Sequence, residues 1–247
     1  IHHRLVGSEM CIRDRPSCEP RPCLIPVTYT HLLFDHDGVL VNSEPLYLQA
    51  IQEQLASLGI ELKEADYIKN MAIGADPWAT ARAAGCDENA IDRLRSARNA
   101  RYQELLSTRP IRIPGVDDVI CELAEHFQLA IVTTSRDQDF DLIHGLGGYP
   151  RTIATPDVVR HMDFILKRSH YQNSKPDPEP YLLALSRFGV EPSNALVIED
   201  SERGLRSAVA AGIHCAAVYH PFTANQDFTH ARYRFGDLGE LKHFLLG

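Results

Sequence analysis

The stretch LLFDHDG, residues 32–38, decides the fold: an apolar run ends in two aspartates and a glycine. A short apolar run of this kind is typical of a buried strand in a parallel sheet, and the glycine allows the chain to turn at its end. Because side chains alternate along a strand, Asp35 and Asp37 are expected to point to one side and His36 to the other. Two carboxylates at one place repel each other, so the pattern favours a bound divalent cation or a proton held by one of the pair.

Length and charge limit what the chain can be. Its 247 residues are enough for one large α/β domain or for a core with a smaller module. The formal net charge of −8 argues against a nucleic-acid partner, since such proteins normally present a basic face. No run approaches the roughly 18 apolar residues of a membrane span, and no secretory signal pattern is present. We therefore expect a cytoplasmic protein with no nucleic-acid or membrane partner, and no pattern indicates an oligomeric state.

Residues 1–27 differ in character from the rest of the chain. They are rich in cysteine, proline and arginine and lack helical or strand periodicity. The string VGSEMCIRDR within them is similar to translated adapter or vector sequence. We expect this segment to be a disordered or non-native leader, and packed structure to begin at Thr28.

A run of helical patterns follows the opening strand. Apolar side chains recur at three- and four-residue intervals up to Gly59. Further helices are expected near residues 63–71, 76–84 and 88–106, the last capped by Asp87, and no strand signal interrupts them. The predicted parts are a leader at 1–27, a core at 28–43 and 111–247, and an all-helical insert at 44–110.

A second apolar strand, FQLAIV at residues 127–132, ends in hydroxyl side chains. These are Thr133, Thr134 and Ser135, and their place at a strand end makes them a second candidate for a site. The same residue types are typical of a helix N-cap, and we expect them to cap the following helix as well.

Two later segments carry charged residues at comparable places. A strand near 163–166 is followed by a polar loop that contains Lys175, and the apolar strand 195–198 is followed by Glu199 and Asp200. The carboxyl ends of parallel strands meet at one edge of a sheet, where ligands collect. Strands and helices continue to alternate to the end of the chain. The pattern predicts an α/β fold with a doubly wound, Rossmann-like parallel sheet and an inserted helical domain.

The order of these residues resembles a known family, the haloacid dehalogenase (HAD) superfamily. The motifs that carry the resemblance are Asp35-x-Asp37-Gly38, Thr133, Lys175-Pro176 and Glu199-Asp200. Each is weak by itself, but all four in order, each at the end of a predicted strand or on the loop after it, are specific. The position of the helical insert resembles the cap of the subgroup that contains phosphoglycolate phosphatases and β-phosphoglucomutases. The resemblance implies a HAD core with a helical cap.

The resemblance also implies a role for each motif residue. Asp35 would be the nucleophile that forms an aspartyl phosphate, and Asp37 would be the general acid and base, which requires a raised pKa. Lys175 would offset the charge between the phosphate and the nucleophile. The implied residues for Mg²⁺ are Asp35, Asp37 through its backbone carbonyl, Asp200, and Glu199 nearby or through a water. The implied phosphate-binding residues are Gly38, Thr133, Thr134, Ser135 and Lys175.

Three functions are compatible with these motifs. We prefer an Mg²⁺-dependent phosphatase acting on a small phosphorylated metabolite, such as phosphoglycolate or a sugar phosphate. A β-phosphoglucomutase-like mutase would need a second phosphate clamp in the cap, for which residues 70–76 and Arg82 are candidates. A non-catalytic binding protein is less favoured because the motifs are intact, and a dehalogenase is disfavoured because dehalogenases of the superfamily lack the second aspartate, Asp37.

Three features have a structural interpretation or depart from the family pattern. Trp78 is expected in the core of the insert rather than on a substrate platform. His36 stands where an apolar or aromatic residue is commoner in the family; because it is expected to point away from Asp35, we favour packing or a hydrogen bond over catalysis. The irregular stretch 149–161 is longer than the family pattern leads us to expect.

Overall fold

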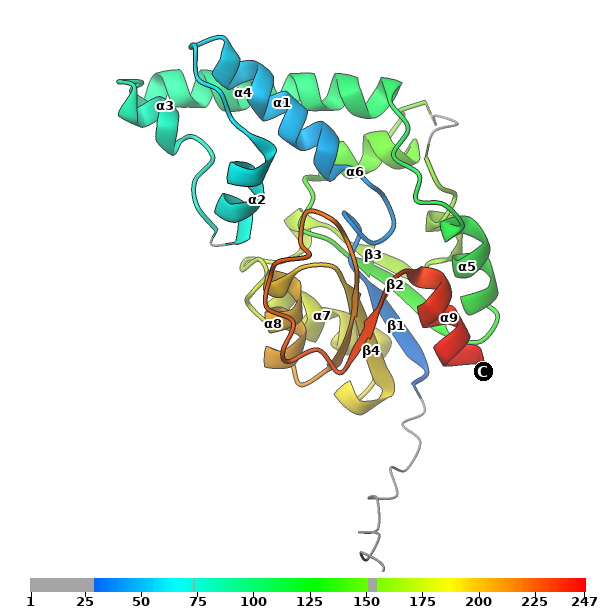
Figure 1. The fold of residues 1–247 in the computed structure, drawn as a ribbon. Helices are drawn as coiled ribbons and strands as arrows, with labels where there is room; N and C mark the ends of the chain where they lie inside the picture. Colours follow the sequence, from blue (N-terminus) through cyan, green and yellow to red (C-terminus); the bar gives the residue numbers. More distant parts are fainter. Residues whose placement is uncertain (1–28, 73, 151–154) are drawn as a thin grey trace, which may run out of the picture.

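The computed structural model describes residues 29–72, 74–150 and 155–247. Within these ranges the chain forms a parallel sheet with the strand order β3-β2-β1-β4-β5-β6 (Figure 1). The strands are β1 (His31–Phe34), β2 (Gln128–Val132), β3 (Phe164–Leu166), β4 (Ala195–Glu199), β5 (His214–Val218) and β6 (Tyr233–Phe235). The order runs outward from β1 in both directions, so the predicted doubly wound fold is confirmed. The predicted leader at 1–27 lies outside the described residues.

The central strand β1 explains the continuous apolar run of the opening stretch. Leu32 and Phe34 pack into the hydrophobic cluster on one face of the sheet, and Leu33 packs into the cluster on the other. Both faces are covered, so every residue of the strand is apolar or buried. Phe34 is level with Ile131 of β2 and Ile198 of β4, so the residues that follow these three strands meet at one edge of the sheet.

Helices cover both faces of this sheet. The first cluster includes side chains of α5 (Val116–Leu123), α6 (Asp137–His144) and α9 (Leu238–Leu246). The second cluster includes side chains of α7 (Glu179–Phe188) and α8 (Glu202–Ala210). Short 3-10 helices lie at Val159–His161, Arg168–His170 and Pro192–Asn194. The result is a three-layer core with the strand ends open at one edge.

A separate layer of helices lies beyond that edge (Figure 1). It consists of α1 (Glu44–Ala56), α2 (Glu64–Ala72), α3 (Ala79–Ala83) and α4 (Glu88–Thr108). Its own hydrophobic cluster contains Leu48, Ile51, Leu55 and Trp78, which is 2% exposed, so the prediction of a core tryptophan is confirmed. Asp87 caps α4 by accepting a hydrogen bond from the backbone N–H of Ala90, as expected. The domain boundaries given above stay a prediction.

One side chain of the sheet-forming part enters the cluster of the helical layer. Phe222 lies in the segment between β5 and β6, is 7% exposed, and packs with the residues of α1 to α4. Its ring centre is 6.3 Å from that of Tyr67 on α2. The helical layer and the sheet are therefore joined by apolar packing as well as by the chain itself.

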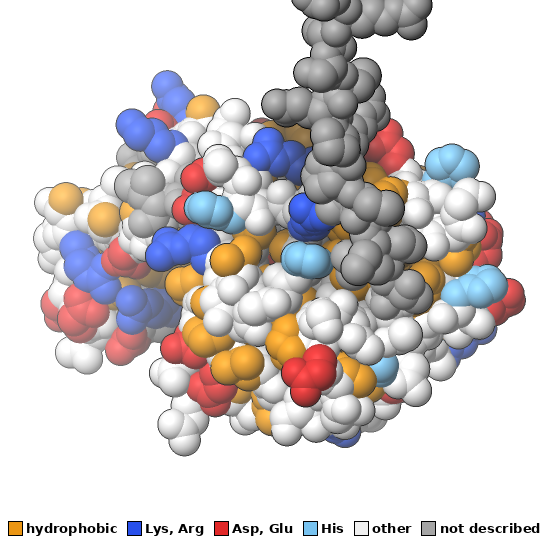
Figure 2. Space-filling view, turned by 90° about the horizontal axis from the view of Figure 1, so that it is seen from below, with side chains coloured by type: hydrophobic (Ala, Val, Ile, Leu, Met, Phe, Trp, Pro, Cys, Tyr) orange, Lys and Arg blue, Asp and Glu red, His pale blue; other side chains and the backbone are white. Residues whose placement is uncertain are grey.

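The edge of the sheet opposite the helical layer carries mixed side chains. Figure 2 looks onto this edge and shows acidic, basic and apolar side chains interspersed over it. Among the described residues, no helix is long and apolar enough to cross a membrane. The candidate site residues that follow β1, β2 and β4 lie at the opposite edge, next to α1 to α4.

Two local predictions are wrong. The hydroxyls of Thr133, Thr134 and Ser135 do not cap α6: its N-cap is Arg136, which makes no side-chain cap hydrogen bond. The helix expected at 76–84 is shorter, since α3 begins only at Ala79. α6 ends at Gly145, which takes the left-handed conformation that favours glycine. Residues 151–154 of the long stretch 149–161 lie outside the described residues.

Candidate active site

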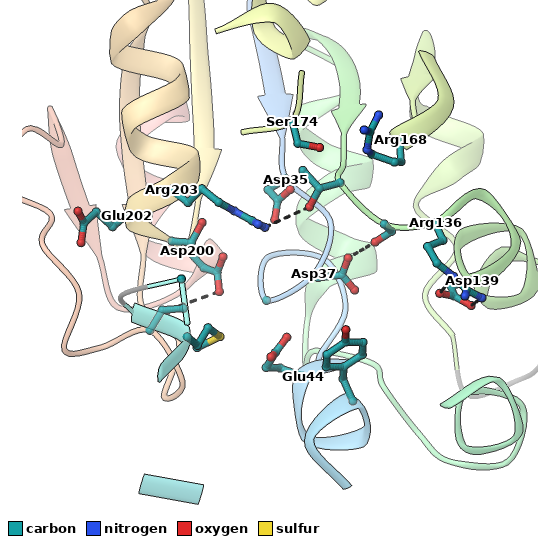
Figure 3. Close-up of a pocket in the computed structure, with 18 of the residues that line it drawn as sticks. Asp35, Asp37, Glu44, Arg136, Asp139, Arg168, Ser174, Asp200, Glu202 and Arg203 are labelled. Atoms are coloured by element: carbon teal, nitrogen blue, oxygen red, sulfur yellow. Dashed lines mark hydrogen bonds and ion pairs between the residues drawn. The ribbon is translucent and has the colours of Figure 1, made fainter. Parts of the chain in front are cut away.

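A cavity of about 830 Å³ lies between the strand ends and the helical layer. Asp35, Asp37 and Asp200 line it from the sheet side, and Tyr67 and Arg98 line it from α2 and α4. Figure 3 shows the three aspartates around one space, with Arg203 of α8 reaching toward it. The sheet topology therefore gathers acidic residues that are up to 165 positions apart in the sequence.

Lys175 is the centre of a buried charge network at the floor of this cavity. Its Nζ donates to Oδ1 of Asp35, to Oε1 of Glu199 and to the carbonyl oxygen of Val132, each at 2.7 Å. Burial disfavours its positive charge, but the carboxylates of Asp35 and Glu199 outweigh this and raise the pKa of Lys175. The ammonium group therefore stays charged where the sequence predicted a cation beside the nucleophile.

Asp35 lies in an environment that opposes its ionisation. Burial is the largest cause, followed by the negative charge of Glu199, and Lys175 offsets them only in part, so the pKa of Asp35 is raised to about 6. Within the described part of the chain only Lys175 donates to this carboxylate, and it does so at Oδ1. Oδ2 thus accepts no side-chain hydrogen bond from the described residues.

Asp37 has the opposite surroundings. Burial alone would raise its pKa, but the charge of His36 and hydrogen bonds from His36, Ser135 and Ser43 outweigh burial and hold the pKa of Asp37 below its usual range. Ser43 donates to Oδ1 and Ser135 to Oδ2. The raised pKa expected for Asp37 is therefore not found, because His36, the hydroxyl that precedes α1 and the hydroxyl that follows β2 all lie against this carboxylate.

His36 points away from the cavity, as the alternation along β1 predicts. It is fully buried, its ring centre is 4.7 Å from that of Phe140, and its Nε2 is 2.9 Å from Nε2 of His144. Its Nδ1 lies 3.4 Å from Oδ2 of Asp37. The interpretation of His36 as a packed, hydrogen-bonded residue is confirmed.

Glu199 is held rigidly below the cavity. Its Oε1 accepts from Lys175 and from the hydroxyl of Tyr181 at 2.9 Å, and its Oε2 accepts from the hydroxyl of Ser201 at 3.0 Å. Gly204 on α8 lies so close that a Cβ there would be 1.8 Å from Glu199 Oε1. The glycine in the string EDSERG is therefore required for the close approach of α8 to this carboxylate.

Asp200 completes a set of carboxylates suited to a cation. Asp35, Glu199 and Asp200 can each offer an oxygen, and these oxygens lie within 4.8 Å of one another. Burial, together with the charges of Glu199 and Asp35, raises the pKa of Asp200 well above its usual range. Gly38 leaves room beside it, since a Cβ there would lie 2.1 Å from Asp200 Oδ2. Hard oxygen ligands with unrelieved repulsion fit a divalent cation such as Mg²⁺.

The residues predicted to bind phosphate lie at two depths. Gly38, Thr134 and Ser135 line the cavity. Thr133 is fully buried beneath them, where its Oγ1 accepts from the backbone N–H of Ser135 and donates to the hydroxyl of Ser135, both at 3.0 Å. Arg203 donates to Oγ1 of Thr134 at 3.3 Å. These hydroxyl groups therefore make hydrogen bonds within the loop between β2 and α6, and they do not cap α6.

Several cavity residues were not predicted. Tyr47, Tyr102 and Arg98 line the helical side, and Arg98 and Tyr102 occupy one stripe of α4. A four-residue spacing on an otherwise polar helix is the signal that could have indicated them. Of the cap candidates, residues 70–76 contribute Met71 and Gly74 to the cavity. Arg82 is not among the lining residues and instead pairs with Asp76 and Glu88.

Comparison with known proteins gives consistent matches. A family model described as haloacid dehalogenase-like hydrolase matches residues 32–218. Protein CbbY of Rhodobacter capsulatus is 30% identical over 218 residues, covering 84% of this chain and 92% of that protein. The N-acetylmuramic acid 6-phosphate phosphatase of Pseudomonas aeruginosa is 28% identical over 202 residues, covering 79% of this chain and 84% of that protein. The crystal structure of CbbY from Rhodobacter sphaeroides in complex with phosphate superposes with a TM-score of 0.68 at 26% identity, covering 87% of this chain and 96% of that chain.

The chain belongs to the haloacid dehalogenase-like hydrolase family. The predictions of this family, of its α/β fold and of an enzyme of the phosphatase class are confirmed by the matches.

Proposed function

We propose that the protein is an Mg²⁺-dependent phosphatase that hydrolyses a small phosphorylated metabolite, of the phosphoglycolate or sugar phosphate class, through an aspartyl phosphate on Asp35. The observation that supports this most directly is the contrast between two aspartates in one cavity. Lys175 holds one oxygen of Asp35 and leaves the other exposed to a ligand, whereas hydroxyl donors hold both oxygens of Asp37. This contrast supports attack by Asp35 and proton exchange by Asp37.

The first half of the proposed reaction forms the aspartyl phosphate. Asp35 Oδ2 bonds to phosphorus in line with the ester oxygen, the phosphorus–oxygen bond of the ester breaks, and Asp37 gives its proton to the leaving oxygen. Asp37 must then be protonated when substrate is bound. A phosphate dianion beside it would raise the pKa of Asp37, because like charges disfavour the ionised form. The substrate thereby supplies the shift that the ligand-free surroundings do not.

The second half releases phosphate. Asp37, now ionised, takes a proton from a water molecule that attacks phosphorus, and the bond between phosphorus and Asp35 breaks. The hydroxyls of Ser43 and Ser135 stabilise the ionised form of Asp37 during this half. Asp37 is thus protonated while the substrate's leaving group lies beside it, and it is ionised after that group has taken its proton.

The cation is proposed to bind Asp35, the backbone carbonyl of Asp37 and Asp200, with Glu199 acting through water. Glu199 is already occupied by Lys175, Tyr181 and Ser201, which supports the indirect role. When bound, Mg²⁺ would neutralise charge between the phosphate and Asp35. Gly38, Thr134 and Ser135, with Lys175 beneath, are proposed to hold the phosphoryl oxygens, and Thr133 to position Ser135.

The helical side of the cavity supports a sugar-like substrate. Tyr47, Tyr67 and Tyr102 line it with aromatic side chains, and Glu44 contributes a carboxylate that accepts a hydrogen bond from Tyr67. Aromatic side chains with a few polar groups suit a compact polar metabolite. The printed names of two relatives, N-acetylmuramic acid 6-phosphate phosphatase and the fructose-1-phosphate phosphatase YqaB of Escherichia coli, describe enzymes for phosphorylated sugars and support the same class here.

Arg98 makes a phosphosugar mutase the second candidate. Its guanidinium lies 4.4 Å from the ring centre of Tyr47, and its Nη1 is buried without a hydrogen-bond partner among the described residues. A half-buried guanidinium at the cavity wall is suited to an anionic group at the far end of a substrate. A mutase needs a cationic group at this place because it holds a bisphosphate.

The cytoplasmic location expected from the sequence stays a prediction.

A panel of phosphate esters tests these functions together. Phosphoglycolate, sugar monophosphates and sugar bisphosphates are incubated with Mg²⁺, with EDTA controls, and phosphate release is measured. Hydrolysis that requires Mg²⁺ and is lost in Asp35→Asn supports the phosphatase. Formation of glucose 6-phosphate from β-glucose 1-phosphate faster than phosphate release supports the mutase. Ligand binding without turnover of any ester contradicts both and supports a binding protein.

A further inference from the structure

Lys175 has no hydrogen-bond donor left over for a substrate phosphate. An ammonium group carries three N–H donors. Nζ of Lys175 uses them on the carbonyl oxygen of Val132 and on the carboxylates of Asp35 and Glu199, each at 2.7 Å. Lys175 can therefore bond to a phosphoryl oxygen only by giving up one of these contacts. Its charge still acts on the phosphate from beneath, but a directed hydrogen bond from a cation must come from another side chain.

The arginines that line the cavity differ in the partners they already have. Arg136 forms a double hydrogen bond with Asp139, and Arg168 donates to two backbone carbonyl oxygens. Among the described residues, the side chain of Arg203 makes one hydrogen bond, from Nη2 to Oγ1 of Thr134 at 3.3 Å, and no ion pair. A guanidinium carries five N–H donors. Most of those of Arg203 therefore have no partner in the described part of the chain.

Arg203 reaches the cavity from the first turn of α8. Figure 3 shows its guanidinium directed into the space beside Asp35 and Asp200. The backbone beneath it is fixed, because Ser201 caps the helix by accepting from the backbone N–H of the buried Gly204 at 3.2 Å. The side chain of Arg203 thus connects the helix after β4 to the loop after β2.

The place of Arg203 in its helix is unfavourable for local reasons. The N-terminal end of a helix carries partial positive charge, which favours acidic residues there and disfavours basic ones. Glu202, the first residue of α8, follows this preference, whereas Arg203, the second, opposes it. No carboxylate of the described residues forms an ion pair with Arg203 to compensate. A residue that opposes its local preference at the wall of a cavity indicates a functional role, and the charge indicates an anionic ligand.

The contact with Thr134 brings Arg203 to the loop that is proposed to bind phosphate. Thr134 and Ser135 line the cavity at this place. Hydrogen bonds to an oxygen are about 2.7–3.2 Å long, so two groups as close as Nη2 of Arg203 and Oγ1 of Thr134 can bond to the same phosphoryl oxygen. The hydroxyl of Thr134 accepts from Arg203 and can donate its own proton to that oxygen.

We propose that Arg203 is a phosphate-binding residue, whose guanidinium donates to a non-bridging oxygen of the substrate's phosphoryl group beside Thr134. It would supply the directed cationic hydrogen bond for which Lys175 has no donor left. The inference rests on the proposed function, because it concerns the phosphoryl group of the same substrate. Negative charge is spread over these oxygens in the transition state of phosphoryl transfer, and the planar fork of a guanidinium suits them better than a point charge does.

Binding of inorganic phosphate to the full chain in the presence of Mg²⁺ tests this role. Calorimetry compares wild type with Arg203→Gln and with Arg206→Gln, which removes the same charge from the cavity wall one turn further along α8. Arg203→Gln is expected to bind phosphate roughly 10–100-fold more weakly, the loss typical of a hydrogen bond to a charged group. Arg206→Gln is expected to lose less than about 5-fold. Equal losses in the two variants would overturn the proposal.

Salt separates a direct hydrogen bond from a general attraction of anions. At about 1 M salt the Debye length is about 3 Å, so a charge that acts only through solvent contributes little. Wild type should still bind phosphate roughly 10-fold more tightly than Arg203→Gln under this condition. If the two proteins bind phosphate equally at high salt, Arg203 only attracts anions to the cavity and the proposal is wrong.

A rescue measurement excludes a merely structural role of Arg203. Guanidinium ion, at a concentration that leaves the fold intact, is expected to restore part of the phosphate affinity of Arg203→Ala, because it can occupy the place of the missing group. Sodium ion at the same concentration is the control, and no gain over sodium would contradict the proposal. None of these measurements requires turnover of an ester. Phosphate binding that depends on Arg203, in a protein that hydrolyses no ester, would support this residue while contradicting the proposed phosphatase.

Discussion

Nζ of Lys175 and Oδ1 of Asp35 are 2.7 Å apart in a contact that is almost sealed from solvent. The same ammonium group contacts Glu199 at the same distance. Because the lysine takes one oxygen of Asp35 only, the other oxygen is left on the cavity side. The pair thus orients the carboxylate as well as balancing its charge.

Removal of the lysine charge is expected to affect stability and activity together. Lys175→Met leaves the carboxylates of Asp35 and Glu199 buried without their cation, so the free energy of unfolding should fall by about 3–5 kcal/mol. Phosphatase activity should fall with it. Urea denaturation measures the first effect. The control is Lys242→Met, which breaks an ion pair with Glu122 at the surface and should cost less than about 1 kcal/mol. Equal losses of unfolding free energy in the two variants would contradict a stabilising role of Lys175 among the buried carboxylates.

Gly204→Ala tests the close approach of α8 to Glu199. In an exposed helix interior this change normally stabilises by about 0.5–1 kcal/mol. Here the new Cβ would lie 1.8 Å from Glu199 Oε1. We expect destabilisation by about 1–3 kcal/mol and reduced activity instead, because the carboxylate that holds Lys175 must move. Val209→Ala, at a half-exposed position of the same helix, should change stability by less than about 1 kcal/mol. A stabilised Gly204→Ala protein would show that the contact is unimportant.

Cation binding should depend on pH with a defined sign. The pKa of Asp35 is raised to about 6, and that of Asp200 is raised as well, so the cation-free folded state holds these protons more tightly than the unfolded chain. The contribution of Asp35 to stability is therefore present at low pH and is lost as the pH rises through about 6, and that of Asp200 is lost in the same direction. A cation competes with the same protons, so its affinity rises over that interval.

Melting temperatures measured with and without Mg²⁺ check this linkage. The increase in melting temperature caused by Mg²⁺ should be small near pH 5 and large near pH 7.5. Asp35 is mostly protonated about one pH unit below its pKa and mostly ionised about one pH unit above it. Asp35→Asn should reduce the difference between the two conditions. An increase that is equal at both pH values would be inconsistent with protons and cation sharing Asp35.

His36→Leu tests the hydrogen bond to Asp37 without emptying the buried site. Leucine fills much of the space beside Phe140 but has no donor for Asp37 Oδ2. The ionised form of Asp37 loses a stabilising partner, so the pKa of Asp37 should rise. The alkaline limb of kcat against pH should then move to higher pH, since the limb of kcat reports the essential acid in the enzyme–substrate complex. His126→Leu, an exposed histidine at the end of α5, is the control and should leave the limb in place. If the limb does not move in His36→Leu, then His36 does not control the pKa of the essential acid.

Much of the core could be predicted because buried parallel strands are short apolar runs that end in polar residues. The strand that precedes Asp35 and the strand that precedes Glu199 are both covered on two faces, so their sequence reports their burial directly. The topology then brings their ends together, since ligand residues of such sheets lie at one edge. The family motifs lie within this part of the chain.

The wrong predictions for the hydroxyl residues after β2 and for the pKa of Asp37 share a physical cause, which is that distant partners replace local ones. Ser43 and the hydroxyls of Thr133 and Ser135 have the local pattern of helix caps, but Ser43 and Ser135 donate to Asp37 instead. A carboxylate is a strong acceptor for a hydroxyl proton, and neither Ser43 nor Ser135 accepts from the backbone N–H groups of the following helix. The lowered pKa of Asp37 follows from His36 together with those two bonds, which depend on how the loops fold.

The helical side of the cavity was harder to predict for a different reason. Arg98 and Tyr47 belong to different helices and meet only because α1 packs on α4. Neither residue follows a strand, so the rule that ligands bind at the carboxyl ends of parallel strands could not predict them.

The most direct test of the account is the identity of the phosphorylated residue. Wild-type protein is mixed with a hydrolysed ester from the panel carrying labelled phosphate, quenched in acid within a single turnover, and digested for peptide mapping by mass spectrometry. Phosphate is expected on Asp35, transient in wild type and absent from Asp35→Asn. Phosphate on any other residue, or hydrolysis that proceeds in Asp35→Asn, would contradict it.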